Sequence, residues 1–167
     1  LTEWAKDKGF DLEGSTMSVQ GFGNVGSHFA VLLSKLGVST IAVGDHSGYL
    51  YNPEGFNPHK LQDHVEKHGA IAGYPAGKSI TREEFWAQKV DICAPCALEN
   101  QIGDEEASAI QARVVVEGAN GPTHPAGEKI LLDRGIEILP DVLANSGGVT
   151  VSYYEWVQNK RSESWTL

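Results

Sequence analysis

The sequence predicts an α/β protein in which helices cover both faces of a doubly wound, mostly parallel sheet. Short apolar runs alternate with helical stretches along the chain, and a glycine-rich turn joins the first strand to the first long helix. Strands separated by helices of about ten residues are typical of right-handed βαβ units and so of parallel sheets. With 167 residues, 41% of them hydrophobic, the chain is long enough to build one compact domain.

The expected elements follow from apolar spacing and from helix-ending residues. Residues 1–8 form a helix that ends at Gly9, where glycine can adopt a left-handed cap. Strands are expected at 16–20, 40–43, 90–94, 114–116 and 136–139, and helices at 24–36, 58–68, 81–88, 104–111, 125–134 and from 148 onward. Residues 48–55 carry turn residues that can form a small hairpin. On the helix at 24–36, the spacing predicts an apolar stripe facing the sheet: Val25, Phe29, Leu32, Leu33 and Leu36.

We expect residues 1–167 to form a single domain, with 1–12 as a connecting helix and 148–167 as the start of a truncated C-terminal helical region. The chain begins at Leu1 and its only methionine is Met17. We therefore expect it to be an excerpt of a longer protein.

Charge and composition exclude several partners. The net charge of −9 repels phosphate backbones and anionic lipid headgroups, so neither nucleic acid nor membrane is an expected partner. The sequence contains no signal stretch and no apolar run of about 18 residues. Two cysteines in such a chain indicate a reducing compartment, and we expect a cytoplasmic protein.

The main motif is the turn GFGNVG at residues 21–26. Gly21 allows a tight turn out of the strand, Gly23 lets a pyrophosphate approach the backbone, and Gly26 lets the helix pack closely on the sheet. The phosphates would then lie at a helix N-terminus, where free N–H groups favour anions. The candidate binding residues of this turn are Gly21, Phe22, Gly23, Asn24, Val25 and Gly26.

A carboxylate follows the second expected strand. Asp45 lies 19 positions after Gly26, close to the spacing of about 20 at which an acidic residue accepts hydrogen bonds from an adenosine ribose. Turn, strands and carboxylate together indicate a Rossmann-type dinucleotide-binding domain. The alternative is a plain tight turn, since a chain with 19 glycines can show the spacing by chance.

Other patterns allow competing interpretations. Cys93 and Cys96 form a CxxC pair that could be redox-active or bind a metal, or simply be apolar packing residues. His64 and His68 lie one helical turn apart but lack the HExxH pattern, so a solvated helix face is favoured over a metal site. We therefore assign no metal.

Two further loops follow expected strand ends, at residues 117–122 and 140–148. Asn120 and Asn145 in these loops could fix a ribose or a carboxamide, because ligands of open α/β sheets bind at the carboxyl ends of strands. Asparagine and glycine also simply make turns, and the two alternatives remain open.

Five ordered segments resemble the glutamate dehydrogenase family, which includes the leucine, phenylalanine and valine dehydrogenases. They are residues 19–26, 51–55, 94–100, 117–122 and 143–156. The resemblance implies reversible oxidative deamination of L-glutamate to 2-oxoglutarate and ammonia, with hydride transfer to NAD or NADP, in a homo-oligomer, a hexamer by analogy.

The resemblance also assigns site residues. It implies that the three glycines hold the pyrophosphate, that Asp45 and His46 lie at the adenosine ribose, and that Ala94 lies along the cofactor. Asn120 and Asn145 are similar to the amides that hold the nicotinamide ribose and carboxamide. Ser152 is similar to the family serine that contacts the side-chain carboxylate of the substrate.

The chain departs from the family pattern in what it lacks. The catalytic lysine and aspartate of the family belong to an amino-terminal substrate domain, so we expect no catalytic residue in this chain and no activity from it alone. Two rival functions remain. One is a leucine-, phenylalanine- or valine-dehydrogenase-like enzyme, against which Ser152 favours glutamate, and the other is a stand-alone NAD-binding module without catalysis.

Overall fold

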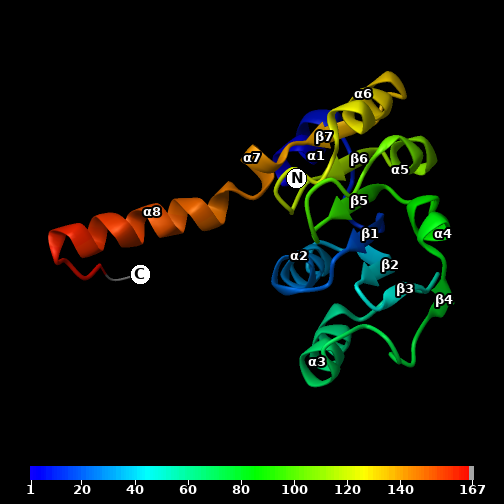
Figure 1. Ribbon diagram of the computed structural model, residues 1–167, viewed down its shortest axis with the longest axis horizontal. Helices are drawn as coiled ribbons and strands as arrows, with labels where there is room; N and C mark the ends of the chain where they lie inside the picture. The colour runs from blue at the N-terminus through cyan, green and yellow to red at the C-terminus, as the bar shows by residue number, and fades with distance from the viewer. Residues whose placement is uncertain (166–167) are drawn as a thin grey trace.

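The protein is a seven-stranded α/β domain from which one long helix extends (Figure 1). The computed structural model describes residues 1–165, so the last two residues of the predicted C-terminal region, 166 and 167, lie outside the described residues. The strand order is β4-β3-β2-β1-β5-β6-β7. The predicted fold class, a doubly wound and mostly parallel sheet, is confirmed.

The parallel part of the sheet consists of five strands: β1 (Thr16–Gln20), β2 (Ser39–Asp45), β5 (Ile92–Pro95), β6 (Val114–Val116) and β7 (Glu137–Leu139). The chain runs outward from β1 through β2 and then returns to β5 on the other side of β1. This reversal creates a topological switch point between β1 and β5, where ligands of open α/β sheets bind beyond the carboxyl ends of the strands.

Two additional strands extend one edge. β3 (Gly48–Tyr51) pairs antiparallel with β2, and β4 (Lys78–Ile80) pairs antiparallel with β3. The small hairpin predicted within 48–55 is not formed there: residues 48–51 are one strand, and the hairpin is β2–β3, which turns at residues 46–47 with Asp45 opposite Gly48. β4 was not predicted, because three residues without buried side chains give little periodic signal.

Helices cover both faces of the sheet (Figure 1). The helices are α1 (Thr2–Lys8), α2 (Asn24–Ser34), α3 (Pro58–His68), α4 (Arg82–Trp86), α5 (Asp104–Ala109), α6 (Pro125–Asp133), α7 (Asp141–Ala144) and α8 (Ser146–Arg161). The predicted left-handed cap at Gly9 is confirmed, with φ 60°. Residues 140–148, expected to be a loop, contain the short helix α7.

Strands β2, β5, β6 and β7 contribute to cores on both faces of the sheet, whereas the apolar residues of β1, Met17 and Val19, belong to one core. On β5, Ile92 and Ala94 belong to the core beneath α2 and α3, whereas Cys93 belongs to the core beneath α4, α5 and α6. Val114 and Val115 of β6 alternate in the same way. Burial on both faces explains why these strands read as continuous apolar runs.

The apolar stripe predicted for α2 is wrong at three positions. Gly26, Ser27, Ala30 and Leu33 are the buried residues of this helix. Val25, Leu32 and Leu36 are exposed, and Phe29 is partly buried. A Cβ at Gly26 would lie only 1.8 Å from the carbonyl oxygen of Gly21, so this close approach fixes which side of the helix faces the sheet.

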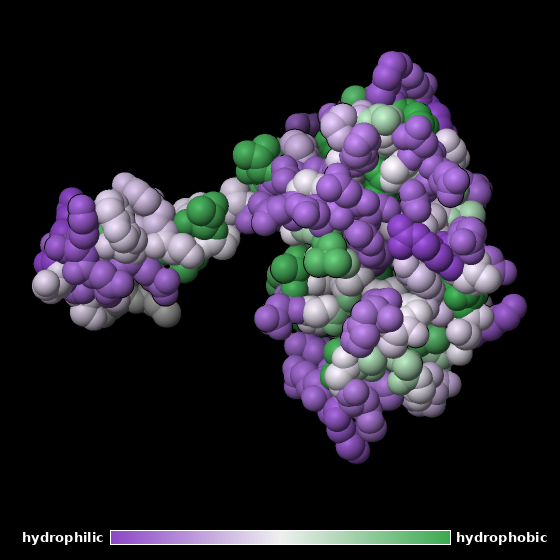
Figure 2. Space-filling view, in the orientation of Figure 1, coloured by the Kyte–Doolittle hydropathy of each residue, from purple (hydrophilic) through white to green (hydrophobic). Residues whose placement is uncertain are grey.

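α8 extends away from the domain as an arm, and none of its residues is buried (Figure 1). The space-filling view shows apolar patches on this arm and on the part of the domain from which it leaves (Figure 2). The exposed apolar residues of α8 are Val149, Val151, Tyr153, Tyr154 and Trp156. Among the described residues, no helix is long and apolar enough to cross a membrane.

Candidate functional site

The glycine turn has the geometry that its sequence predicts. Gly21 adopts φ +92°, and a Cβ there would lie 2.6 Å from the backbone nitrogen of Ala97. Gly23 is the N-cap of α2 and has open space around the position of a Cβ. Each glycine thus has a different role. Gly21 allows a turn with positive φ, Gly23 leaves the backbone open to a ligand, and Gly26 allows the helix to pack closely on the sheet.

The other residues of the turn differ in exposure. Phe22 is buried in the core and anchors the turn. Asn24 and Val25 are exposed, and Val25 lies on the rim between two hollows. α2 thus begins with its free N–H groups directed to an accessible surface, which favours an anion.

Two hollows lie at this edge of the sheet, and each is named here after residues that line it. The glycine-loop hollow, about 800 Å³, extends from Gly21 and Gly23 to Asp45 and Tyr49. The asparagine hollow, about 1170 Å³, is lined by Gly118, Asn120 and Asn145. Both hollows are also lined by Val25, Cys96, Ala97, Leu98 and Gln101. They therefore adjoin and form one continuous groove along the carboxyl ends of β1, β2, β5 and β6.

Asp45 ends β2 and lines the glycine-loop hollow, but its carboxylate already has protein partners. Oδ1 accepts hydrogen bonds from the backbone nitrogen of Ser47 at 2.7 Å and from its Oγ at 2.5 Å. Oδ2 accepts one from the backbone nitrogen of Ile71 at 2.8 Å. A carboxylate has about four acceptor sites, so roughly one remains for a ligand. His46, whose Nδ1 lies 3.9 Å from Asp45 Oδ2, is strongly exposed beside it.

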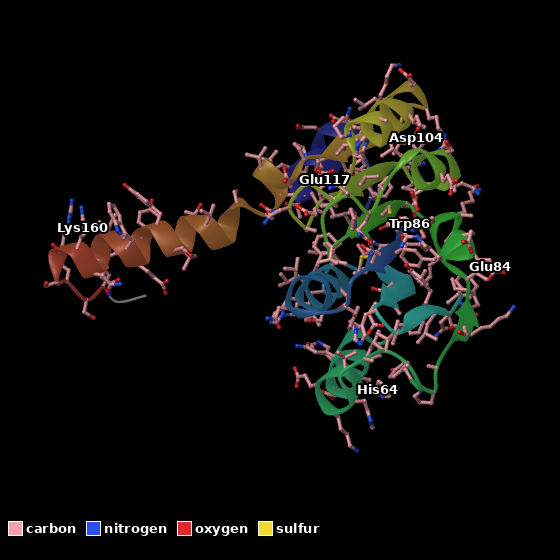
Figure 3. The ribbon with its side chains drawn as sticks, in the orientation of Figure 1. His64, Glu84, Trp86, Asp104, Glu117 and Lys160 are labelled. Atoms are coloured by element: carbon pink, nitrogen blue, oxygen red, sulfur yellow. The ribbon has the colours of Figure 1, made fainter. Side chains whose placement is uncertain are left out.

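Asn120 and Asn145 come from two different loops and contact each other. Asn145 Nδ2 donates to Asn120 Oδ1 at 2.7 Å, and both side chains line the asparagine hollow. Asp141 supports this arrangement from α7, because its Oδ2 accepts from the backbone nitrogen of Gly121. The backbone nitrogen of Asp141 in turn donates to Glu117 Oε2 at 2.9 Å. Figure 3 labels Glu117, which is buried near the base of α7.

Ala94 does not lie in either hollow. It is fully buried between α2 and the sheet, so its side chain has no access to a ligand. Alternation along β5 directs the Ala94 side chain into the core, so a contact with a cofactor would come from its backbone and stays a prediction. The residues that line the hollows after this strand are Cys96, Ala97 and Leu98.

Ser152 is also outside both hollows, on the exposed part of α8. Val149 lines the asparagine hollow, and Ser152 follows three residues later. Residues i and i+3 share a helix face, so Ser152 continues the side of α8 that begins at the hollow. Its contact with a substrate stays a prediction.

The thiols are not activated. Cys93 and Cys96 are free and buried, and burial raises the pKa of each to about 12. A thiolate is the reactive form of cysteine, so the structure disfavours redox chemistry here and supports packing roles. Among residues 1–165, no group of three or more His, Cys, Asp or Glu side chains could hold a metal ion.

His64 and His68 stack on each other, with ring centroids 4.4 Å apart. His64 Nε2 lies 3.0 Å from the carbonyl oxygen of Ala72, so this ring has a structural partner. Figure 3 shows His64 on α3, away from the strand ends that form the groove.

Several groove residues were missed by sequence reasoning. Gln20 Nε2 donates to Gln101 Oε1 at 2.9 Å across the ends of β1 and β5. Tyr49 and Arg82 line the glycine-loop hollow and hydrogen-bond to each other. No local motif marks Tyr49 and Arg82, because only the antiparallel edge of the sheet brings them to the groove.

Comparison with known proteins identifies relatives of the whole chain. A sequence model described as Glutamate/Leucine/Phenylalanine/Valine dehydrogenase matches residues 1–167. The chain is 51% identical over 160 residues to a glutamate dehydrogenase of Thermotoga maritima, covering 95% of this chain and 38% of that protein. It is 43% identical over 169 residues to an NAD-specific glutamate dehydrogenase of Clostridioides difficile, covering 98% of this chain and 40% of that protein.

A solved structure shows the same architecture. The hetero-hexameric glutamate dehydrogenase of Thermus thermophilus, in a leucine-bound form, superposes with a TM-score of 0.88 at 32% identity. The match covers 99% of this chain and 39% of that one. The chain thus spans about two fifths of the length of these relatives.

Proposed function

Because the chain belongs to the glutamate/leucine/phenylalanine/valine dehydrogenase family, we propose that it is the cofactor-binding domain of a glutamate dehydrogenase. Its proposed cofactor is NAD, with NADP as the weaker ligand. The observation that carries the proposal is the continuous groove at the switch point, which begins at a glycine turn and ends at a pair of amides. The names of the two sequence relatives support the choice of ligands. Both are glutamate dehydrogenases, and the relative from Clostridioides difficile is NAD-specific.

The groove accommodates the dinucleotide in one direction. The pyrophosphate lies at Gly23 and the N-terminus of α2, and the adenosine ribose lies toward Asp45 and His46. The nicotinamide end lies in the asparagine hollow. Since Asn145 Nδ2 donates to Asn120 Oδ1, the Asn120 amide N–H groups and the Asn145 carbonyl oxygen remain for a ligand. One donor and one acceptor side by side complement a carboxamide.

The proposed reaction is the reversible oxidative deamination of L-glutamate to 2-oxoglutarate and ammonia. The cofactor would accept the hydride from the substrate Cα, and the residues of this chain would bind and orient it. In the described part of the chain, no lysine lines either hollow. We propose that the acid–base groups belong to a separate substrate domain of a longer protein, and that the full enzyme is a hexamer.

Glutamate is proposed over leucine, phenylalanine or valine because of Ser152. A hydroxyl on the helix face that begins at Val149 suits a substrate carboxylate better than an apolar side chain. A comparison of glutamate and leucine turnover by the full-length enzyme would decide between these substrates.

Substitution at Gly23 tests cofactor binding directly. Gly23 has an extended backbone with φ −84° and open space around a Cβ, so Gly23→Asp should fold normally. Its carboxylate would repel the pyrophosphate and weaken NAD binding by at least tenfold in a calorimetric titration. Asn159→Asp adds the same charge on the exposed arm and should leave NAD affinity unchanged. Equal NAD affinity of wild type and Gly23→Asp would refute the proposed placement.

A further inference from the structure

Arg82 lines the groove, and the family resemblance gives this residue no role. It follows β4 and begins α4, and β4 runs in the same direction as β2 because both pair antiparallel with β3. The end of β4 and the start of α4 therefore lie at the carboxyl edge of the sheet, where the groove is formed. Arg82 lines the glycine-loop hollow together with Asp45 and Tyr49.

The guanidinium of Arg82 is held in a fixed orientation. Nε and Nη2 donate to Glu106 Oε1 at 3.3 and 3.0 Å, Nη1 donates to Tyr49 Oη at 3.1 Å, and Nη2 donates to the carbonyl oxygen of Gln101 at 3.1 Å. Glu106 is itself fixed, because its Oε2 accepts from the backbone nitrogen of Gly103. A guanidinium restrained from three sides presents a plane of constant orientation.

Arg82 also forms the wall between two hollows. On one side, the guanidinium carbon lies over the ring of Trp86, 5.8 Å from its centroid, and both residues line a small hollow of about 200 Å³. On the other side, Arg82 borders the glycine-loop hollow. Figure 3 shows Trp86 on the α4 side of the sheet. Arg82 thus lies between the ring of Trp86 and the groove.

From this geometry we infer that Arg82 binds the adenine ring of the dinucleotide, with its guanidinium stacked on the base. The inference rests on the proposed function, which places the adenosine between Asp45 and the wall formed by Arg82 and Tyr49. A planar, delocalised cation stacks well on a flat aromatic ring.

A role in binding a 2′-phosphate fits the geometry less well. Arginine has five N–H groups, and four hydrogen bonds to Glu106, Tyr49 and Gln101 already use most of them. Bidentate phosphate binding requires two free, parallel N–H groups. The Glu106 carboxylate also offsets the charge that would attract a phosphate. Because most N–H groups are already paired, the inference assigns the contact with the base to the plane of the guanidinium.

Binding of cofactor fragments to the 167-residue chain tests this inference. The probes are AMP, 2′,5′-ADP and nicotinamide mononucleotide, followed by ligand-observed NMR. Arg82→Ala should weaken AMP binding by about fivefold to thirtyfold and leave nicotinamide mononucleotide binding unchanged. Arg82→Lys keeps the charge beside Glu106 but loses the plane, so it should fold and show most of the same loss. Arg113→Ala, at an exposed arginine that pairs with Asp91 outside the groove, should leave the binding of all three probes unchanged.

The outcomes separate the inference from the proposed function. Unchanged AMP affinity in a folded Arg82→Lys or Arg82→Ala variant would overturn the role of Arg82 alone. A loss confined to 2′,5′-ADP would overturn stacking on the base and identify a phosphate contact. Equal losses for AMP and nicotinamide mononucleotide would show that Arg82 acts only through the fold. Failure of the wild-type chain to bind NAD or any probe would contradict the proposed function itself.

Discussion

At the scale of single residues, the Asp45 carboxylate holds the local fold through hydrogen bonds and is also the proposed partner of a ribose. Its carboxylate orders the turn to β3 through Ser47 and holds the backbone of Ile71, which leaves about one acceptor site for a ribose. Its negative charge nevertheless disfavours a 2′-phosphate at the same place. We therefore expect the chain to bind NAD more tightly than NADP, by about tenfold, in parallel calorimetric titrations. Equal or tighter binding of NADP at neutral pH would contradict this role of Asp45.

Ser152 carries a prediction for the full-length enzyme. Loss of one hydrogen bond to a charged group costs about 1.5–3 kcal/mol, so Ser152→Ala should raise the glutamate KM at least tenfold. NAD affinity should remain nearly unchanged, because Ser152 lies outside both hollows. Thr150→Ala, two residues back toward the domain and therefore on another face of the helix, is the matched control and should affect KM less. A variant that loses NAD affinity but keeps its glutamate KM would show that Ser152 contacts a different ligand.

Sequence reasoning identified the residues whose role depends on local geometry. The glycines at 21, 23 and 26 each require a conformation or a space that their spacing reveals. Ala94 and Arg82 could not be placed in this way. Whether Ala94 faces the core or the groove depends on the phase of β5, and Arg82 reaches the groove only through β4, which has no detectable pattern.

At the scale of elements, the link between α4 and α5 depends on the Arg82–Glu106 pair. Burial by itself would raise the pKa of Glu106, but the hydrogen bonds from Arg82 and from the backbone of Gly103 and Glu106, together with the charge of Arg82, outweigh burial, and the pKa lies below the ordinary value of 4.5. A carboxyl whose pKa is lower in the folded state stabilises the fold above its unfolded pKa, and this stability is lost as the pH falls through the folded pKa.

Glu106→Gln tests this electrostatic contribution. At pH 7 the variant should melt a few degrees below wild type, because it loses the charged partner of Arg82 and part of the cap at Gly103. As the pH falls below 4.5, the difference in melting temperature should shrink, since the wild-type carboxyl then becomes protonated as well. Glu105→Gln, an exposed neighbour, is the control and should show little difference at either pH. A difference that is the same at pH 7 and pH 3 would show that charge is not involved.

The elements also show where periodicity fails to predict burial. On α2, two overlapping series of residues have helical spacing, and the more apolar one is largely exposed. The small residues Gly26, Ser27 and Ala30 face the sheet because the turn at Gly21 brings the backbones together. Because the backbones of α2 and the glycine turn lie so close together, only small side chains fit between the helix and the sheet. The larger apolar side chains of α2 therefore lie mostly on its exposed side.

At the scale of the whole molecule, the domain and the arm differ in how they are stabilised. Two cores on opposite faces of the sheet hold the domain together. α8 buries nothing and exposes several large apolar side chains, including Tyr153 and Trp156. Exposed apolar patches of this kind mark interaction surfaces. We expect the 167-residue chain to fold cooperatively in its domain, while the arm unfolds separately and exchanges its amide hydrogens rapidly.

The same chain should be inactive as an enzyme. In its described part, neither hollow is lined by a lysine to act on the substrate, and the groove is open to water on the side of the arm. With saturating NAD and glutamate, an absorbance assay should detect no NADH formation. Clear glutamate-dependent NADH formation by the purified chain would show that catalytic residues lie within it and that their proposed location in another domain is wrong.

Hydrogen exchange with and without NAD tests the central claim, that the two hollows form a single dinucleotide groove. Binding of NAD should slow exchange both at the glycine turn, residues 21–26, and at the two asparagine loops, residues 118–121 and 141–146. AMP should protect the first region alone, and α3 should be unaffected by either ligand. Protection by NAD of only one hollow, or of neither, would contradict the account.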